Sequence, residues 1–201
     1  MKSVFVKHYS LPVEYDKTEI FRYLGAKNPD EEIIRLTDEC LRECDNIFAM
    51  SVCAYESQIG KENGKLVFDS FSAESSDLEK NLSGCERVII FAATIGIGID
   101  RLITKYSLLS PAKALVFQAV GAERIEALCD KFCKDMSLEY EKEGCFLRPR
   151  FSPGYGNLSL SVQKDIFSLL GCEKRTGLTL SDNLLMSPTK SVTAFSGIYR
   201  K

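Results

Sequence analysis

The sequence has 201 residues, with 26 basic and 28 acidic side chains, one histidine, eight cysteines and no tryptophan. Hydrophobic residues make up 45% of the chain and charged residues 27%, which is typical of a folded globular protein and excludes global disorder. The net charge of −2 creates no long-range field that would attract nucleic acid or an anionic membrane, so we expect neither as a partner.

The first predicted element is a strand from Lys2 to Tyr9, where apolar and polar residues alternate, with Leu11-Pro12 as the break after it. This strand contains the single histidine, His8, which we expect on a strand face. Zinc sites that mix His and Cys, Ser-His-Asp triads and histidine proton shuttles need a well-placed imidazole, so these classes are excluded. The N-terminus has no apolar segment followed by a small-residue cleavage site, and nowhere do about 18 apolar residues run together. We therefore expect a cytoplasmic protein without a membrane span.

The next elements are two helices, two strands joined by a hairpin turn at residues 60–64, and a short helix. Their predicted ranges are Lys17–Leu24, Pro29–Ile47, Phe48–Ile59, Lys65–Phe71 and Ser75–Leu82. Asn28 is the expected N-cap of the second helix, because Pro29 suits the first helical position.

Arg87 to Thr94 is the most continuously apolar run in the chain, and strands of this kind are normally buried on both faces. We therefore expect it at the centre of the sheet. The following turn contains Gly96 and Gly98 and leads into a helix from Asp100 to Leu109, an order that is also found in phosphate-binding loops. Arg101 replaces the third glycine of that motif and no G-K-S/T sequence follows, so a purely structural turn is the other interpretation.

A long helix is predicted from Pro111 to Glu143, with Ser110 as its N-cap. Its first half is small and apolar and should lie against the sheet, whereas the charged half from Asp130 onward should emerge toward solvent. No internal repeat, low-complexity segment or linker is present, so residues 1–201 are expected to form one domain. The expected fold class is α+β, with a mixed or antiparallel sheet packed against long helices.

The eight cysteines are expected to be free thiols, because the sequence shows no sign of export to an oxidising compartment. There is no C-x-x-C motif of the thioredoxin or ferredoxin kind. Cys40/Cys44 and Cys129/Cys133 have helical i,i+4 spacing and could meet as a four-thiolate zinc site. Helices place such residues on one face in any case, and cysteine is often buried, so we predict no metal.

Residues 144–157 form a predicted loop of about 14 residues, and loops of this length inside a compact domain are usually functional. The loop combines arginines, prolines, glycines and aromatic residues. Prolines restrict the chain, glycines allow close backbone approach, and an arginine suits a carboxylate or phosphate. The alternative is a rigid surface loop whose arginines pair with neighbouring acids.

Within this loop, Arg150-Phe151-Ser152-Pro153-Gly154-Tyr155 matches the motif R-x-x-x-G-Y, and here the sequence resembles the activation domain of cobalamin-dependent methionine synthase. The segments that follow resemble the family in the same order, namely a helix at Val162–Leu170, then Cys172–Asn183, Met186-Ser187-Pro188 and a strand at Ser191–Phe195. Residues 87–201 form the part most similar to the family, and residues 1–86 form an N-terminal strand, helix and hairpin part. The resemblance implies the fold of that domain.

The resemblance also implies a ligand, S-adenosylmethionine, and residues that bind it. In the family, the motif arginine contacts the ligand and the backbone two residues further on lines the same site. Arg150 is thereby identified as the principal ligand-binding residue and Ser152 as a source of backbone groups, whereas Gly154 and Tyr155 shape the loop. A bidentate guanidinium suits the carboxylate of the methionine portion. No catalytic side chain is implied.

The family restores cobalamin that has been oxidised to Co(II), using one electron and a methyl group from S-adenosylmethionine, so the ligand and the cofactor supply the reactivity. This sequence has no D-x-H-x-x-G cobalamin motif. The resemblance therefore implies a separate cobalamin-carrying methionine synthase or corrinoid protein, with flavodoxin or ferredoxin as electron donor. After the strand that corresponds to Ser191–Phe195, the family domain continues into another strand, which carries a ligand-contacting tyrosine. Tyr199 is not equivalent to that tyrosine. We therefore expect a short reactivation module that works in trans.

Two other functions are kept open. One is a non-catalytic docking module that binds a corrinoid protein without using S-adenosylmethionine. The other is a nucleotide-binding enzyme whose site is the Gly96/Gly98 turn.

Overall fold

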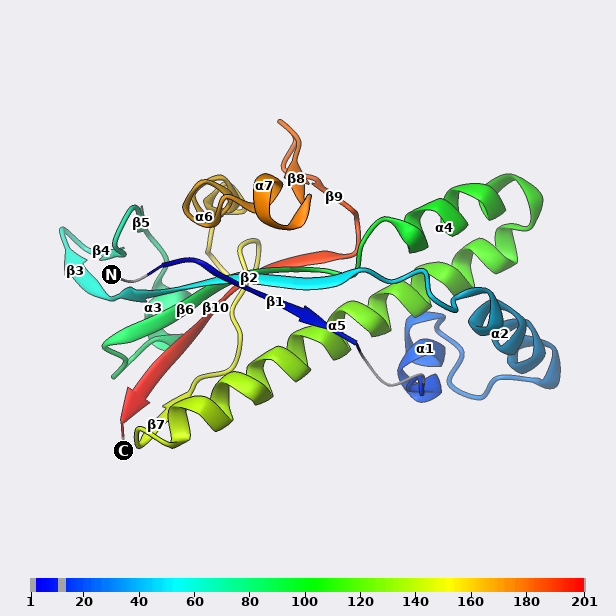
Figure 1. Cartoon of the computed structure of the whole chain (residues 1–201), viewed down its shortest axis with the longest axis horizontal. Helices are drawn as coiled ribbons and strands as arrows, with labels where there is room; N and C mark the ends of the chain where they lie inside the picture. The colour runs from blue at the N-terminus through cyan, green and yellow to red at the C-terminus, as the bar shows by residue number, and fades with distance from the viewer. Residues whose placement is uncertain (1–2, 11–13, 201) are drawn as a thin grey trace.

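The computed structural model describes residues 3–10 and 14–200, and its centre is a five-stranded sheet in the order β1-β2-β6-β10-β7 (Figure 1). All neighbouring strands in it are antiparallel. In the order of the sheet, the strands are β1 Phe5–Tyr9, β2 Met50–Gln58, β6 Arg87–Thr94, β10 Ser191–Arg200 and β7 Cys145–Leu147. The predicted α+β class is confirmed, and the predicted central strand is β6. The predicted break at residues 11 and 12 lies outside the described residues.

The helices are α1 Lys17–Tyr23, α2 Glu31–Glu43, α3 Ser76–Asn81, α4 Gly98–Leu109, α5 Pro111–Glu141, α6 Val162–Leu170 and α7 Cys172–Thr176. Short strands form two small sheets, one of β3 Gly60–Glu62, β4 Lys65–Val67 and β5 Ser72–Ala73, the other of β8 Thr179–Leu180 and β9 Met186–Ser187. None of the helices among the described residues is long and apolar enough to cross a membrane.

Both faces of the central sheet are covered, which explains the continuous apolar run of β6 (Figure 1). Ile89, Phe91 and Ala93 belong to the core cluster on the side of α5, whereas Val88, Ile90 and Ala92 belong to the cluster on the side of α6 and α7. Successive side chains of a strand point to opposite faces, so β6 needs apolar residues at each position from Val88 to Ala93.

The orientation predicted for the long helix was wrong. The first half of α5 packs among α1, α2 and α4, and the charged second half lies along the sheet (Figure 1). Phe132, Met136 and Tyr140 are buried there, and the ring of Phe132 lies 4.8 Å from that of Phe91. Three apolar residues at helical spacing are enough to bind this half to the sheet, while its charged residues occupy the other faces.

Several predicted boundaries are also corrected. The N-cap of α2 is Asp30 and not Asn28, because Asp30 Oδ1 accepts a hydrogen bond from the N–H of Ile33 at 2.9 Å. Ser110 precedes α5 without a capping hydrogen bond from its side chain. The predicted 60–64 turn is only Asn63-Gly64, both with positive φ, so Gly60–Glu62 is a strand that pairs with β4.

The Gly96/Gly98 turn has a structural explanation. Gly96 has φ +84°, which favours glycine. A Cβ on Gly98 would lie 2.1 Å from the carbonyl oxygen of Ile47, so only glycine allows this close approach of the two chain segments. The packing accounts for both glycines without a bound phosphate.

The cysteines are free thiols in the structure. Cys40 lies on α2 and Cys44 is the C-cap of that helix, whereas Cys129 and Cys133 lie on α5. Across residues 3–10 and 14–200, no group of three or more His, Cys, Asp and Glu side chains is arranged to hold a metal ion.

Candidate functional site

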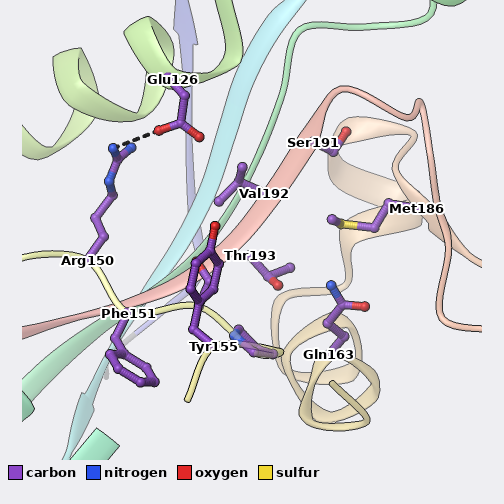
Figure 2. A pocket seen from close by; sticks show the side chains of 11 residues that line it. Glu126, Arg150, Phe151, Tyr155, Gln163, Met186, Ser191, Val192 and Thr193 are labelled. Carbon is purple, nitrogen blue, oxygen red and sulfur yellow. Dashed lines mark hydrogen bonds and ion pairs between the residues drawn. The ribbon is translucent and has the colours of Figure 1, made fainter. Parts of the chain in front are cut away.

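A cavity of about 360 Å³ lies beside the part of the predicted loop that the structure keeps irregular, residues 148–157, which we call the 148–157 loop (Figure 2). Its walls come from this loop, α5, α6, β9 and β10. The lining residues are Glu126, Arg150, Phe151, Ser152, Pro153, Tyr155, Gln163, Met186, Ser191, Val192 and Thr193. This volume is at the lower end of the roughly 300–1,000 Å³ of small-molecule sites.

The inner side of the 148–157 loop is bonded to β10, the neighbour of the central strand. Phe151 and Phe195 exchange two backbone hydrogen bonds of 2.9 and 2.8 Å, and the N–H of Arg148 donates to the carbonyl of Gly197 at 2.8 Å. Ser196 Oγ donates to the carbonyl of Arg148 at 2.7 Å. The loop therefore starts from a rigid sheet edge, which fixes the backbone on both sides of Arg150.

The outer side of the loop is held by α3 through Asn157. The N–H of Asn157 donates to Asp77 Oδ2 at 3.1 Å, and the N–H of Asp77 donates to Asn157 Oδ1 at 3.2 Å. Ser75 Oγ also donates to Asn157 Oδ1 at 2.6 Å. Gly156 has φ +53°, and a Cβ there would lie 2.4 Å from Asp77 Oδ2, so this glycine allows the contact. We call this set of bonds the α3 clamp.

Arg150 reaches from the loop to α5. Its Nη2 donates to Glu126 Oε2 at 3.0 Å and to Asp130 Oδ1 at 2.8 Å. Its Nη1 is buried and has no hydrogen-bond partner among the described residues. Burial opposes the charge of the guanidinium, but acidic neighbours that include Asp130 and Glu126 more than offset this and raise the pKa of Arg150. A permanently charged group with one free, desolvated nitrogen suits an anionic ligand.

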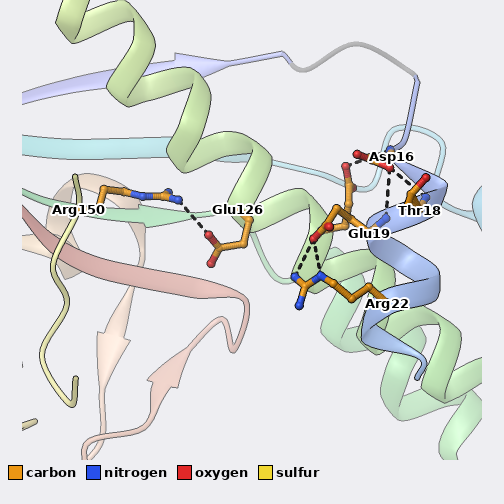
Figure 3. Close-up of polar contacts among 7 residues, drawn as sticks. Asp16, Thr18, Glu19, Arg22, Glu126 and Arg150 are labelled. Atoms are coloured by element: carbon orange, nitrogen blue, oxygen red, sulfur yellow. Dashed lines mark hydrogen bonds and ion pairs between the residues drawn. The ribbon is translucent and has the colours of Figure 1, made fainter. Parts of the chain in front are cut away.

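Arg22 provides a comparison within the same molecule, because it also pairs with a carboxylate (Figure 3). Its nitrogens donate twice to Glu19 Oε2, at 2.6 and 2.9 Å, three residues along α1. The Arg22 side chain is 59% exposed, whereas that of Arg150 is 23% exposed. An exposed pair of this kind is weakened by solvent and needs no ligand to explain it.

The other loop residues indicated by the sequence lie in different places. Ser152 lines the cavity, and its carbonyl accepts a hydrogen bond from the N–H of Tyr155 at 3.2 Å. Tyr155 also lines the cavity, although its side chain is 70% exposed (Figure 2). Gly154 has φ +91° and turns the chain, but it is outside the cavity lining.

Two lining residues that the sequence reasoning missed, Gln163 on α6 and Thr193 on β10, are buried polar side chains. Gln163 Oε1 and Thr193 Oγ1 have no hydrogen-bond partner among the described residues. Gln163 lies beside Val162 and shares the buried face of α6 with Ile166. A glutamine on the apolar face of this helix could have indicated a binding residue from the sequence, because a buried amide needs a hydrogen-bond partner.

The chemistry of the lining favours binding over acid-base catalysis. Its ionisable side chains are Glu126, Arg150 and Tyr155. The nearby thiols are those of Cys129, which is in the core, and Cys133, which is partly buried against it. Burial raises the pKa of Cys129 to about 12 and that of Cys133 to about 11, although Arg150 opposes both shifts. These thiols stay neutral near pH 7 and are poor nucleophiles. The site therefore suits a ligand that brings its own reactivity.

Known proteins resemble this chain in sequence pattern and in fold. A family model described as vitamin B12 dependent methionine synthase, activation domain, matches residues 14–200. A crystal structure of the MetH reactivation domain bound to AdoHcy is similar, with a TM-score of 0.70 and 15% sequence identity. The similarity covers 97% of this chain and 78% of that chain. No curated protein matches the sequence.

Proposed function

The chain belongs to the activation-domain family of vitamin B12-dependent methionine synthase, and on that premise we propose that its cavity binds S-adenosylmethionine for the reactivation of cobalamin. The observation that carries this proposal is Arg150, which lines the cavity with Nη1 buried and unpartnered. The similar MetH domain, which has the same fold, is bound to AdoHcy. AdoHcy is S-adenosylmethionine without the transferred methyl group.

The residues of the cavity suit the charges of this ligand. The free Nη1 of Arg150 donates to the carboxylate of the methionine portion, and the Ser152 backbone provides polar groups beside it. The Glu126 carboxylate, also in the lining, complements the ammonium and sulfonium charges. Gly154 and Tyr155 hold the loop in the shape that presents Arg150.

S-adenosylmethionine supplies an activated methyl group when bound, so the chain contributes position and not acid-base chemistry. Arg150 and Ser152 orient the amino-acid portion. The 148–157 loop is preorganised by β10 and by the α3 clamp, which lowers the entropy lost on binding.

The cobalamin comes from outside these residues, because the sequence has no D-x-H-x-x-G motif. We propose that a separate methionine synthase or corrinoid protein carries it and docks over the cavity, and that flavodoxin or ferredoxin supplies the electron. The protein then acts in trans as a reactivation subunit.

The ligand is tested with Arg150→Ala. The variant should bind S-adenosylmethionine about 1.5–3 kcal/mol more weakly, the usual contribution of a hydrogen bond to a charged group. Isothermal titration calorimetry measures this, with Arg22→Ala as a control that removes an exposed arginine and leaves binding unchanged. Equal affinity of Arg150→Ala and the wild type would refute the assignment.

The action in trans is tested by mixing the protein with a Co(II)-corrinoid methyltransferase, S-adenosylmethionine and a reductant. We expect methylcobalamin to form, as followed by its absorbance, and to form more slowly with Arg150→Ala. If none forms, the reactivation proposal is wrong. Capture of the corrinoid protein by Arg150→Ala without S-adenosylmethionine would then favour a docking module.

A further inference from the structure

The cavity has two chemically different ends (Figure 2). Arg150 and Glu126 form a charged end, where Nη2 of the arginine donates to Oε2 of the glutamate. Gln163 and Met186 lie at the opposite end, and Thr193 lies between, with its hydroxyl on the side of Gln163. The second end contains no charged lining residue. A ligand that fills the cavity must therefore have one charged portion and one neutral portion.

The neutral end carries two polar groups that the protein leaves unpaired. Gln163 is 5% exposed and Thr193 is 2% exposed, and neither Gln163 Oε1 nor Thr193 Oγ1 has a partner among the described residues. Ser191 on the same strand differs, because its hydroxyl donates to the carbonyl of Pro188 at 2.7 Å and also shares a hydrogen bond of 2.9 Å with the hydroxyl of Thr94. Each unpaired buried group costs about 1–3 kcal/mol. Two such groups, from α6 and β10, lining one cavity indicate that a ligand satisfies them.

The chemistry of this pair selects a class of ligand portion. A carboxamide has an acceptor oxygen and two donor hydrogens, and a hydroxyl can donate and accept. Neither group carries charge, so this end offers no opposite charge to an anionic or cationic portion. A carboxamide pairs in bidentate fashion with the edge of adenine that has an amino group beside a ring nitrogen. The thioether of Met186 adds an apolar, polarisable surface that favours an aromatic ring.

We propose that Gln163 and Thr193 recognise the amino-bearing edge of the purine base, and so determine the specificity of this cavity for an adenine-containing ligand. The inference rests on the proposed function, because it assumes that the charged end holds the amino-acid portion. The base then lies at the Gln163 end, away from Arg150.

The test measures binding of AdoHcy and of an analogue that has hydrogen in place of the 6-amino group of the purine. Wild-type protein should prefer AdoHcy by about tenfold, the equivalent of 1.4 kcal/mol and close to one good hydrogen bond. Gln163→Met keeps the volume and removes the amide, so AdoHcy should bind about tenfold more weakly while the analogue is unaffected. The preference between the two ligands should disappear, which a merely structural role of Gln163 would not produce.

Thr193→Val provides a second, isosteric variant, and it should reduce the same preference if Gln163→Met does not fold. Gln118→Met is the matched control, because Gln118 is an exposed residue of α5 outside the cavity lining, and it should retain the tenfold preference. A preference that survives in both Gln163→Met and Thr193→Val overturns the inference and leaves the proposed function intact. A wild-type protein that binds neither ligand overturns both.

Discussion

The molecule contains two glycine-bearing segments that both suggested a ligand site from sequence, and they differ in what surrounds them. At the turn after β6, a Cβ on Gly98 would lie 2.1 Å from the carbonyl oxygen of Ile47, so the glycine allows two backbone segments to pack. At the 148–157 loop, the chain borders a cavity and Nη1 of Arg150 is unpartnered. The presence of glycine therefore does not distinguish packing from binding. Buried polar groups without partners, beside an open cavity, do.

The largest effect that we expect is a loss of stability on substitution of Gly98, which tests whether the turn after β6 serves packing and not binding. Gly98→Ala forces a methyl group against backbone that cannot move independently, so we expect the free energy of unfolding to fall by about 3 kcal/mol, at the upper end of overpacking effects. Urea unfolding measures this change. The fraction that remains folded should bind S-adenosylmethionine with unchanged affinity, because the turn is outside the cavity lining.

Gly60→Ala is the matched control, since the nearest atoms to its Cβ would be at 3.8 Å, an ordinary contact distance. Its stability should change by less than about 0.5 kcal/mol. If instead Gly98→Ala keeps its stability and loses ligand affinity, the turn after β6 is part of a binding site and the comparison is wrong.

Most elements of the fold could be predicted because their signals are local. The apolar run of β6 is visible in a single segment, and the helix α6 was predicted from the family resemblance of the segment that follows the R-x-x-x-G-Y motif; both elements have the predicted bounds. The direction taken by α5 was not predictable in this way. Its charged second half is held against the sheet by Phe132, Met136 and Tyr140, which are buried. Only the position of the sheet in the folded chain shows that these three residues, and not the charged ones, determine where this half lies.

The site residues likewise fall into those that a single segment indicates and those that only the folded structure brings together. Arg150 and Ser152 belong to one contiguous motif, so the sequence was sufficient to select both, and they line one cavity. Glu126, Gln163 and Thr193 come from three other elements, and their relation to Arg150 exists only after folding. The absence of a hydrogen-bond partner is also a property of the packed structure, so the unpaired state of Gln163 and Thr193 could not be predicted from the sequence.

We expect a smaller effect when the α3 clamp is removed, which tests how the 148–157 loop is held in place. Asn157→Ala removes the carboxamide that accepts from Ser75 Oγ and from the N–H of Asp77. These groups are exposed or partly exposed, so the loss of stability should be about 1 kcal/mol. Because the same loop carries Arg150, we also expect S-adenosylmethionine to bind about fivefold more weakly, again near 1 kcal/mol.

Calorimetric titration and urea unfolding of the same Asn157→Ala sample separate these two effects. Asn183→Ala, which truncates an exposed asparagine between β8 and β9, should change neither quantity. If Asn157→Ala loses stability but binds with wild-type affinity, the bonds between Phe151 and Phe195 are sufficient to position Arg150. The position of Arg150 would then depend on β10 alone. The α3 clamp would contribute to stability but not to binding, as the close contact between Gly98 and Ile47 does at the turn after β6.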